Sequence, residues 1–260
     1  MKDINNIGTL YLTSEYVIRN PSLHEEDTPW KVGKIIPLID RVVDCFGEHE
    51  INLLDVGGGA GSILDAISAY IEKSYAIKVN RFSLDLSPDM LKVQTKRNPR
   101  LKKALTEDIC ETSLADKEVD LTLMIDVLEH IPEPIKALEE IKRISRFAIF
   151  KVPLEDNLFL RALNFIQRGQ PRQGLIEKFG HINIYRFSNL RDQIEKHSGQ
   201  VLEYYFTNVF DHFLKSEHYR KRISKRGQLV NSVAACVFKL SPKLCSLVFN
   251  DFVMILIECY

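Results

Sequence analysis

The chain has 260 residues, of which 45% are hydrophobic, enough for one large α/β core or a core with a small addition. Thirty-five basic residues balance 35 acidic ones, so no global field favours a nucleic acid. The chain shows neither a basic-then-apolar leader nor an apolar run of about 18 residues. Its five cysteines lack a C-x-x-C pair, so we expect a cytoplasmic protein with reduced, mostly buried thiols.

The first 50 residues carry two helical patterns, over residues 14–19 and 29–46, separated by a polar stretch. Pro29 directly after Thr28 is typical of a capped helix start. We therefore expect residues 1–50 to form an N-terminal helical cap that precedes the first strand.

A glycine-rich turn follows the first strand of the predicted sheet. Residues 51–56 are mostly apolar, and Gly57, Gly59 and Gly61 come next, before a helical pattern. Such a turn lets a ligand lie against bare backbone at a helix N-terminus. The dinucleotide fingerprint would need a third glycine at position 62, where this chain has serine, so a dehydrogenase is disfavoured.

Three acidic segments follow at the ends of further predicted strands. A second strand ends at Asp85, before a helix that Ser87 and Pro88 begin. A short apolar run leads to Asp108, and the strand 121–125 leads to Asp126. Open α/β sheets bind ligands at such carboxyl ends. Asp85 suits either a ribose contact or a turn, and Asp108 alone suits a solvated loop equally well.

These four segments, in this order, resemble the class I S-adenosylmethionine-dependent methyltransferases. The Asp-x-x-Glu-His-x-Pro string at 126–132 resembles small-molecule and ubiquinone-pathway O-methyltransferases in particular. The resemblance implies that the glycines pass under the methionine part of the cofactor and that Asp55 orders its amino group. It implies further that Asp85 holds the ribose and Asp108 the adenine amino group. The implied S-adenosyl-L-methionine site comprises Lys31, Asp55, Gly57, Gly59, Gly61, Asp85, Leu86, Asp108, Ile109, Ile125 and Asp126.

Lys31 enters this set through the segment 29–35, which resembles the helix before the glycine motif in the ubiquinone-pathway enzymes. There a basic residue reaches the cofactor's carboxylate. A solvated lysine explains position 31 equally well.

The resemblance implies a doubly wound, Rossmann-like sheet of seven strands, six parallel and the last antiparallel. Residues 51–207 are expected to form the core, with an insertion at 154–180, and 251–260 the final strand. Within the core we predict a strand at 147–152, a helix at 155–167, a loop at 168–174, a helix at 189–197 capped by Ser188 and ending at Gly199, and a strand at 201–206.

Residues 208–250 lengthen what is a near-direct hairpin in this fold, and they predict a helical insertion over the site. The run 215–226 holds six basic residues and one acidic residue, which suits either a solvated helix face or a docking surface for an anionic group. The apolar segments 230–240 and 244–249 are expected to be buried, as apolar helical stripes ordinarily are.

Methyl transfer to a hydroxyl is helped by a base, and histidine is the usual one. The predicted topology places His130 and His181 near the strand carboxyl ends, and His130 suits a structural role at least as well. Some relatives bind a divalent ion through a related motif, which Asp126, Glu129, His130 and His181 resemble. Asp126 is shorter than the glutamate of those relatives, so no metal is assigned.

The sequence thus predicts a methyltransferase acting at oxygen on a small or lipid-like acceptor, without nucleic acid as a partner. N- or C-methylation stays open, as does a catalytically silent methyltransferase-fold binding partner.

Overall fold

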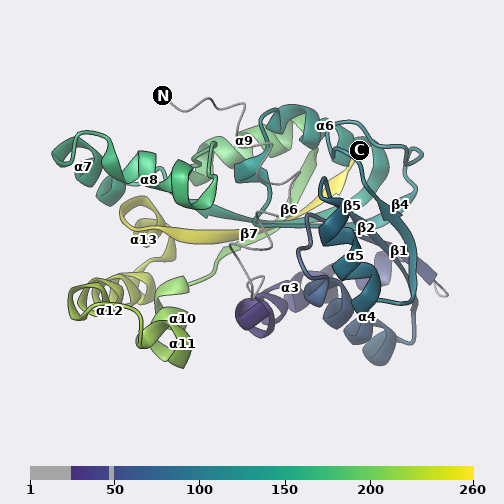
Figure 1. Cartoon of the computed structure of the whole chain (residues 1–260), viewed down its shortest axis with the longest axis horizontal. Helices are drawn as coiled ribbons and strands as arrows, with labels where there is room; N and C mark the ends of the chain where they lie inside the picture. Colours follow the sequence, from purple (N-terminus) through teal and green to yellow (C-terminus); the bar gives the residue numbers. More distant parts are fainter. Residues whose placement is uncertain (1–24, 47–49) are drawn as a thin grey trace.

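One seven-stranded sheet organises the chain, in the order β3-β2-β1-β4-β5-β7-β6 (Figure 1). The computed structural model describes residues 25–46 and 50–260. Only β7 runs antiparallel to its neighbours β5 and β6. The predicted fold, six parallel strands and a last antiparallel one, is therefore confirmed. The strands are β1 Glu50–Val56, β2 Lys78–Leu84, β3 Leu101–Leu105, β4 Val119–Ile125, β5 Ser145–Leu154, β6 Gly199–Phe206 and β7 Asp251–Cys259.

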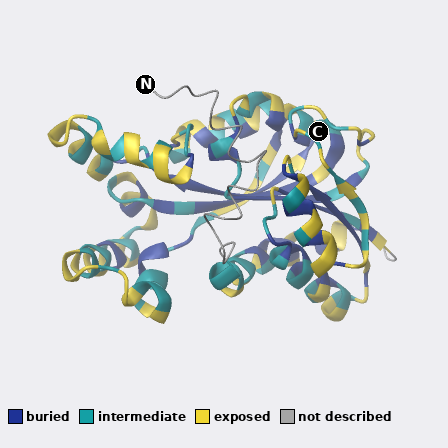
Figure 2. Ribbon diagram, in the orientation of Figure 1, coloured by how far each residue is buried: buried dark blue, intermediate teal, exposed yellow. Residues whose placement is uncertain are grey.

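The central strands are apolar nearly throughout because helices cover both faces of the sheet (Figure 2). On one face, α3 (Thr28–Val42) and α4 (Ser62–Tyr75) bury side chains such as Leu38 and Ile67. On the other face, α6 (Pro134–Ile144) and α9 (Phe187–His197) bury Leu138 and Ile194. This packing fixes the carboxyl ends of β1, β4 and β5, from which the site is built.

One of the predicted helix caps is confirmed. α5 (Pro88–Arg97) has Ser87 as its N-cap, and the Ser87 hydroxyl accepts the amide of Met90 at 3.3 Å. α3 begins at Thr28, but its N-cap residue is Asp27 and no side chain caps it, so the predicted capped start is wrong. The helix continues into a 3-10 turn, Val43–Cys45. A 3-10 turn, Glu25–Asp27, precedes it. The predicted helix at 14–19 lies outside the described residues.

The segment between β5 and α9 corrects two predictions. The loop expected at 168–174 is wrong, because the helix α8 (Gln170–Phe179) begins after Gly169, whose φ is 89°. Pro171 lies in the first turn of α8, where backbone nitrogens have no hydrogen-bond partner within the helix, so a proline there breaks no helical bond. The preceding helix, α7 (Leu158–Ile166), begins three residues later than expected because Asn157 caps it and accepts the amide of Leu160.

The predicted capping of α9 is also wrong at both ends. The helix begins at Phe187, so Ser188 lies inside it and its hydroxyl bonds Asn189 instead. Gly199 is the first residue of β6 and does not cap the helix. A Cβ at Gly199 would overlap the carbonyl of Glu258, so close approach of β7 requires glycine there.

Four helices lie between β6 and β7 and, with α7 and α8, occupy one end of the molecule (Figure 1). They are α10 (Val209–Lys215), α11 (Glu217–Arg220), α12 (Lys225–Leu240) and α13 (Pro242–Val248). α10, α12 and α13 share a small core that includes Phe210, Ala234 and Cys245. The expected burial of both apolar segments is only partly right, because Leu240 and Leu244 are exposed.

Two further sequence expectations concern the whole chain. All five cysteines are free thiols, but only Cys245 and Cys259 are buried, whereas Cys45 and Cys236 are exposed. Mostly buried thiols were therefore the wrong expectation. Within residues 25–46 and 50–260, no helix combines the length and the hydrophobicity that crossing a bilayer requires.

Candidate functional site

A cavity of about 770 Å³ opens at the carboxyl ends of β1, β4 and β5. The glycine loop and the start of α4 form one wall, and the start of α3 forms another. Helices α8, α10 and α11 complete it with apolar and aromatic side chains. The predicted site residues that line it are Lys31, Asp55, Gly57, Gly59, Ile125, Asp126, His130 and His181.

The glycine loop has the backbone geometry that its sequence indicates. Gly57, Gly59 and Gly61 adopt φ values of 61°, 56° and 76°, a region that side chains disfavour. The amide of Gly57 donates to the carbonyl of Leu84 at 2.8 Å, which ties the loop to β2. At Gly58 a Cβ would overlap the Asp55 carboxylate, so this position has no room for a side chain. The loop therefore lies directly on Asp55.

The carboxylate of Asp55, at the end of β1, lies beneath this loop without full hydrogen bonding. Its side chain is buried, and its Oδ2 has no hydrogen-bond partner among the described residues. Burial, together with the nearby charge of Asp85, raises the pKa of Asp55 to about 7. A buried acceptor beneath a backbone cradle matches the ammonium group of S-adenosylmethionine, which would supply both a donor and a positive charge.

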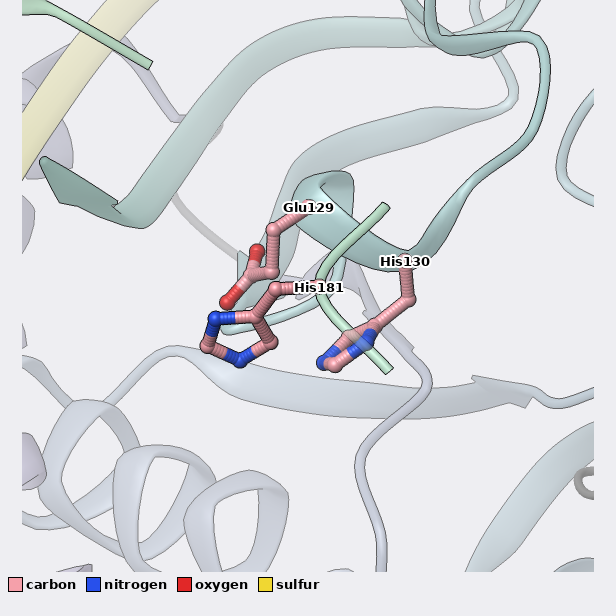
Figure 3. A group of neighbouring side chains, drawn as sticks. All are labelled: Glu129, His130 and His181. Atoms are coloured by element: carbon pink, nitrogen blue, oxygen red, sulfur yellow. The ribbon is translucent and has the colours of Figure 1, made fainter. Parts of the chain in front are cut away.

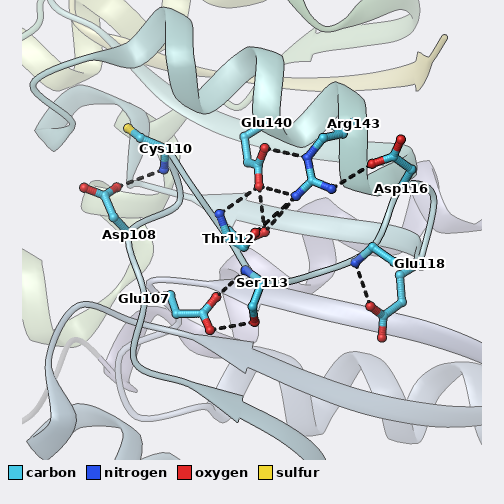
Figure 4. Close-up of polar contacts among 10 residues, drawn as sticks. Glu107, Asp108, Cys110, Thr112, Ser113, Asp116, Glu118, Glu140 and Arg143 are labelled. Carbon is cyan, nitrogen blue, oxygen red and sulfur yellow. Dashed lines mark hydrogen bonds and ion pairs between the residues drawn. The ribbon is translucent and has the colours of Figure 1, made fainter.

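The residues predicted to hold the ribose and the adenine lie outside the cavity lining. Asp85 directly follows β2 and accepts the amide of Ser87 at 2.9 Å, and burial raises its pKa to about 6. Asp108 accepts the amide of Cys110 at 2.9 Å within its own turn (Figure 4). Leu86 is partly exposed, and Ile109 is buried. The roles of these four residues, and of Gly61, stay predictions.

Two glutamates, Glu107 beside Asp108 and Glu140 from α6, hold the turn that carries Asp108 (Figure 4). Glu107 accepts both the amide and the hydroxyl of Ser113, at 2.8 and 2.7 Å. Glu140, from α6, accepts the amide and the hydroxyl of Thr112 and pairs with Arg143. The loop between β3 and β4 is thus fixed to α6 beside the sheet edge.

Asp126 joins the end of β4 to two lysines. Its φ of 60° turns the chain sharply, and its carboxylate pairs with Lys31 at 2.9 Å and with Lys151. Burial alone would raise the pKa of Asp126, but the two ammonium groups hold it well below its usual range. Lys151, on β5, is 1% exposed, and its Nζ lies 3.4 Å from the ring centroid of Phe252. Lys31 therefore reaches the cavity wall, as its predicted role requires.

Glu129, His130 and His181 converge in the lining of the cavity (Figure 3). The Nδ1–H of His130 donates to the Gly180 carbonyl at 3.1 Å, and the two imidazole centroids are 5.0 Å apart. Burial, with the adjacent His181, lowers the pKa of His130 to about 4. His130 is therefore neutral near pH 7 and weakly basic, which favours its structural role over a catalytic one.

His181 has the partner that a base needs. Its Nδ1 lies 2.8 Å from Oε1 of Glu155, a buried carboxyl group at the end of β5. An ionised Glu155 accepts from Nδ1–H, so Nε2 carries the lone pair. A carboxylate on the far nitrogen also stabilises the imidazolium that forms when Nε2 takes a proton. Of the two predicted histidines, His181 has the geometry of a general base.

The same three side chains could also bind a divalent ion. One ligand atom each from Glu129, His130 and His181 lies within 4.8 Å of the others, and Oε2 of Glu129 has no hydrogen-bond partner among the described residues. A backbone carbonyl on Nδ1 of His130 fixes its tautomer as metal sites require. Asp126, which the sequence placed in such a set, is instead paired with the two lysines.

A polar contact joins α3 to α10 and α11 across the cavity. Asp27 lies 3.0 Å from Nε2 of His212 and 2.6 Å from the hydroxyl of Tyr219. The His212 ring stacks on Trp30, with centroids 4.5 Å apart. The residues between β6 and β7 thus close over the cavity wall that α3 provides.

Comparison with known proteins identifies the central region. Residues 54–146 match the family described as "Methyltransferase domain". The match covers 93 of the 260 residues, from β1 to the start of β5. The fold of the chain is that of solved methyltransferases, and the match over residues 54–146 supports the predicted enzyme class and S-adenosylmethionine as the cofactor.

Individual relatives are distant. An uncharacterized methyltransferase of Bacillus subtilis, YcgJ, is 20% identical over 169 residues, which are 65% of this chain and 60% of that protein. A Galdieria sulphuraria protein provisionally named sarcosine dimethylglycine methyltransferase has a TM-score of 0.59 at 13% identity, over 85% of this chain and 83% of its own.

A third relative carries ligands. The geranyl diphosphate C-methyltransferase of Streptomyces coelicolor has a TM-score of 0.56 at 9% identity, over 85% of this chain and 79% of its own. That structure holds Mg²⁺, geranyl diphosphate and S-adenosyl-L-homocysteine. None of these similarities singles out the ubiquinone-pathway type.

Two important side chains escaped the sequence analysis. Lys151 is the one charged residue in the apolar run 147–152, and this exception could have marked it. Glu155 lies just beyond the strand and carries no such signal, because an acidic residue after a strand is ordinarily solvated.

Proposed function

We propose that the protein transfers the methyl group of S-adenosylmethionine to a hydroxyl of a small or lipid-like acceptor bound in the cavity. The observation that carries this proposal is the Glu155–His181 pair, which lines the same cavity as the glycine loop. O-methylation needs a proton acceptor at the attacking oxygen, and this pair provides one.

The cofactor side of the cavity suits the methyl donor. The orphaned Asp55 oxygen and the backbone of Gly57 and Gly59 would receive the methionine part, and Lys31 its carboxylate. Asp85 and Asp108 are proposed for the ribose and the adenine. When bound, the cofactor supplies an electrophilic methyl group on sulfur. The chain's own task is to align the acceptor and exclude water.

His181 would act on the acceptor. Its Nε2 takes the hydroxyl proton as the oxygen attacks, and Glu155 holds the ring and stabilises the resulting positive charge. Leu175, Phe179 and Phe213 line the acceptor end of the cavity, and the Lys178 ammonium lies at its edge. This lining suits an apolar acceptor, including one with an anionic group. Geranyl diphosphate, bound by the Streptomyces relative, has that character.

The test is turnover of labelled cofactor with a metabolite extract, followed by identification of the product. His181→Gln and Glu155→Gln should each lower kcat, the former by about 100-fold or more, with cofactor affinity nearly unchanged. His197→Gln is the matched control, because His197 pairs with Glu139 at 2.9 Å in the same manner outside the cavity. Wild-type turnover in His181→Gln would remove the proposed base.

N-methylation and C-methylation make different demands on the same residues. A neutral amine attacks without a base, so His181→Gln should leave its methylation nearly intact. Such a result, with a nitrogen in the labelled product, would replace the O-methylation proposal.

A metal-assisted variant is the second candidate, and the convergence of Glu129, His130 and His181 favours it. Here a divalent ion would bind the acceptor oxygen and lower its pKa. Metal analysis of the purified protein and activity after chelator treatment test this variant. Glu129→Gln should then abolish both metal content and activity, whereas a metal-free base mechanism predicts chelator-resistant turnover.

A further inference from the structure

Helices α12 and α13 expose an apolar stripe on the outside of the molecule. Leu229, Val233, Cys236 and Leu240 are exposed at intervals of four, three and four residues, so they share one face of α12. Leu229 is 67% exposed and Leu240 87%. Leu244 and Leu247 continue the series on α13 and are also exposed. Single exposed leucines are ordinary, but a continuous stripe is not.

The charged residues of the same segment are all basic. Residues 218–250 contain seven lysines and arginines and neither aspartate nor glutamate, although the whole chain has no net charge. Lys225 and Arg226 stand at one end of the stripe, and Lys239 and Lys243 at the other. All four are exposed, and none lies within 4 Å of a carboxylate in residues 25–46 or 50–260. The stripe is therefore flanked by unneutralised cations.

Helix α7 exposes further apolar side chains at the same end of the molecule (Figure 1). It packs against the end of α13 through Phe159 and Phe249, whose ring centroids are 5.9 Å apart. At its far end, Phe165 is 89% exposed and Ile166 72%, and exposed Arg168 follows. Both helical segments lie at the end of the molecule farthest from α4 and α5 (Figures 1 and 2).

We propose that α7, α12 and α13 form a docking surface for an anionic lipid bilayer. The exposed leucine and phenylalanine side chains would enter the boundary between headgroups and acyl chains, while the flanking lysines and arginines contact lipid phosphates. A nucleic acid would use the cations but leave the apolar stripe in water. An anionic membrane surface complements both features, because its phosphates attract the cations and its acyl chains accept the apolar side chains.

The surface lies on elements that also build the cavity. α8, which follows α7, contributes Phe179 to the lining, and α10, which packs on α12, contributes Phe213. Docking would therefore bring the cavity close to the bilayer. The proposal does not depend on the identity of the methyl acceptor.

Co-sedimentation with phosphatidylcholine vesicles, with and without phosphatidylglycerol, tests the surface. We expect the wild-type chain to bind only the phosphatidylglycerol vesicles at low salt and to be released as salt rises. The triple variant Lys225→Gln, Lys239→Gln, Lys243→Gln should bind on the order of 100-fold more weakly, since each cation near an anionic surface contributes about fivefold. Leu229→Ser and Leu240→Ser should each weaken binding by about tenfold.

The control variant neutralises three exposed lysines at the opposite end of the sheet, Lys73, Lys96 and Lys102, and should bind vesicles like the wild type. Circular dichroism and thermal unfolding report whether each variant folds, and turnover of a soluble acceptor reports the proposed function separately. Three results would overturn the proposal: no binding of the wild type to anionic vesicles, equal losses in the control variant, or a wild-type dimer that Leu229→Ser and Leu240→Ser dissociate. The last result would assign the stripe to a second copy of the chain.

Discussion

Replacing Asp55 by asparagine should stabilise the protein above neutral pH while weakening the cofactor site. The pKa of Asp55 is about 7 in the folded protein, against 3.8 as the ordinary value. Because the folded-state pKa is raised, the protonated carboxyl favours folding at low pH, and this contribution is lost as pH rises towards 7. The difference of about 3 pKa units corresponds to about 4 kcal/mol. Asparagine resembles the protonated carboxyl and does not titrate.

Thermal unfolding of the wild type and of Asp55→Asn should therefore agree near pH 4 and diverge by about 1.4 kcal/mol per pH unit up to pH 7. At pH 8 we expect the variant to melt about 10 °C higher. Asp44→Asn, at an exposed carboxylate in the turn after α3, should show no such divergence. If Asp55→Asn is no more stable than the wild type at pH 8, the buried, unpartnered state of Asp55 is wrong.

Cofactor binding tests the same residue from the other direction. An ammonium group beside Asp55 would favour the ionised carboxylate, so binding near pH 6 should release a proton. Calorimetry in two buffers of different ionisation enthalpy measures that proton. Asp55→Asn should abolish the release and lower cofactor affinity by roughly tenfold or more, as expected for a lost charge-assisted hydrogen bond. Tighter binding by the variant would exclude the ammonium contact.

Four further substitutions test the glycine loop and the elements near it. Gly58→Ala should displace the Asp55 carboxylate and reduce cofactor affinity, which calorimetry measures. Gly33→Ala should stabilise the fold by about 0.5–1 kcal/mol in thermal unfolding, because a Cβ there meets no atom within 4 Å inside α3. Lys151→Met should cost about 3 kcal/mol in urea unfolding, since it removes one partner of a buried ion pair. Asp85→Asn should lower the pH at which Asp55 ionises, because it removes a neighbouring negative charge, and the pH profile of stability will report the change.

The parallel core could be predicted because its signals are local and strong. Buried strands are continuous apolar runs, and the glycines at 57, 59 and 61 mark a turn that only a few backbone conformations allow. The insertion at 154–180 was predicted less well. Gly169 and Pro171 indicate a loop by composition, yet a left-handed glycine and a first-turn proline also begin a helix, and α8 begins that way.

Some residues of the candidate site could likewise be predicted from the sequence, whereas others could be recognised only from their contacts in the structure. Asp55 and His181 could be proposed from motif and position. The choice of His181 over His130 needed the contacts of both rings, because Glu155 lies 26 residues from His181 and Gly180 lies 50 residues from His130. The exposed stripe on α12 was read as buried because a helical apolar period gives the spacing of a face and not what covers it. Only tertiary packing distinguishes these cases.

A single turn after β4 carries three of the residues that line the cavity, Asp126, Glu129 and His130. The left-handed conformation of Asp126 directs its carboxylate to Lys31 and Lys151, beside the glycine loop. The chain then enters the 3-10 turn Leu128–His130, which presents Glu129 and His130 towards His181. The Asp-x-x-Glu-His spacing thus places the first side chain beside the two lysines and the last two beside His181. Because Asp126, Glu129 and His130 depend on one backbone turn, a shift at Asp126 would also move the two side chains that meet His181.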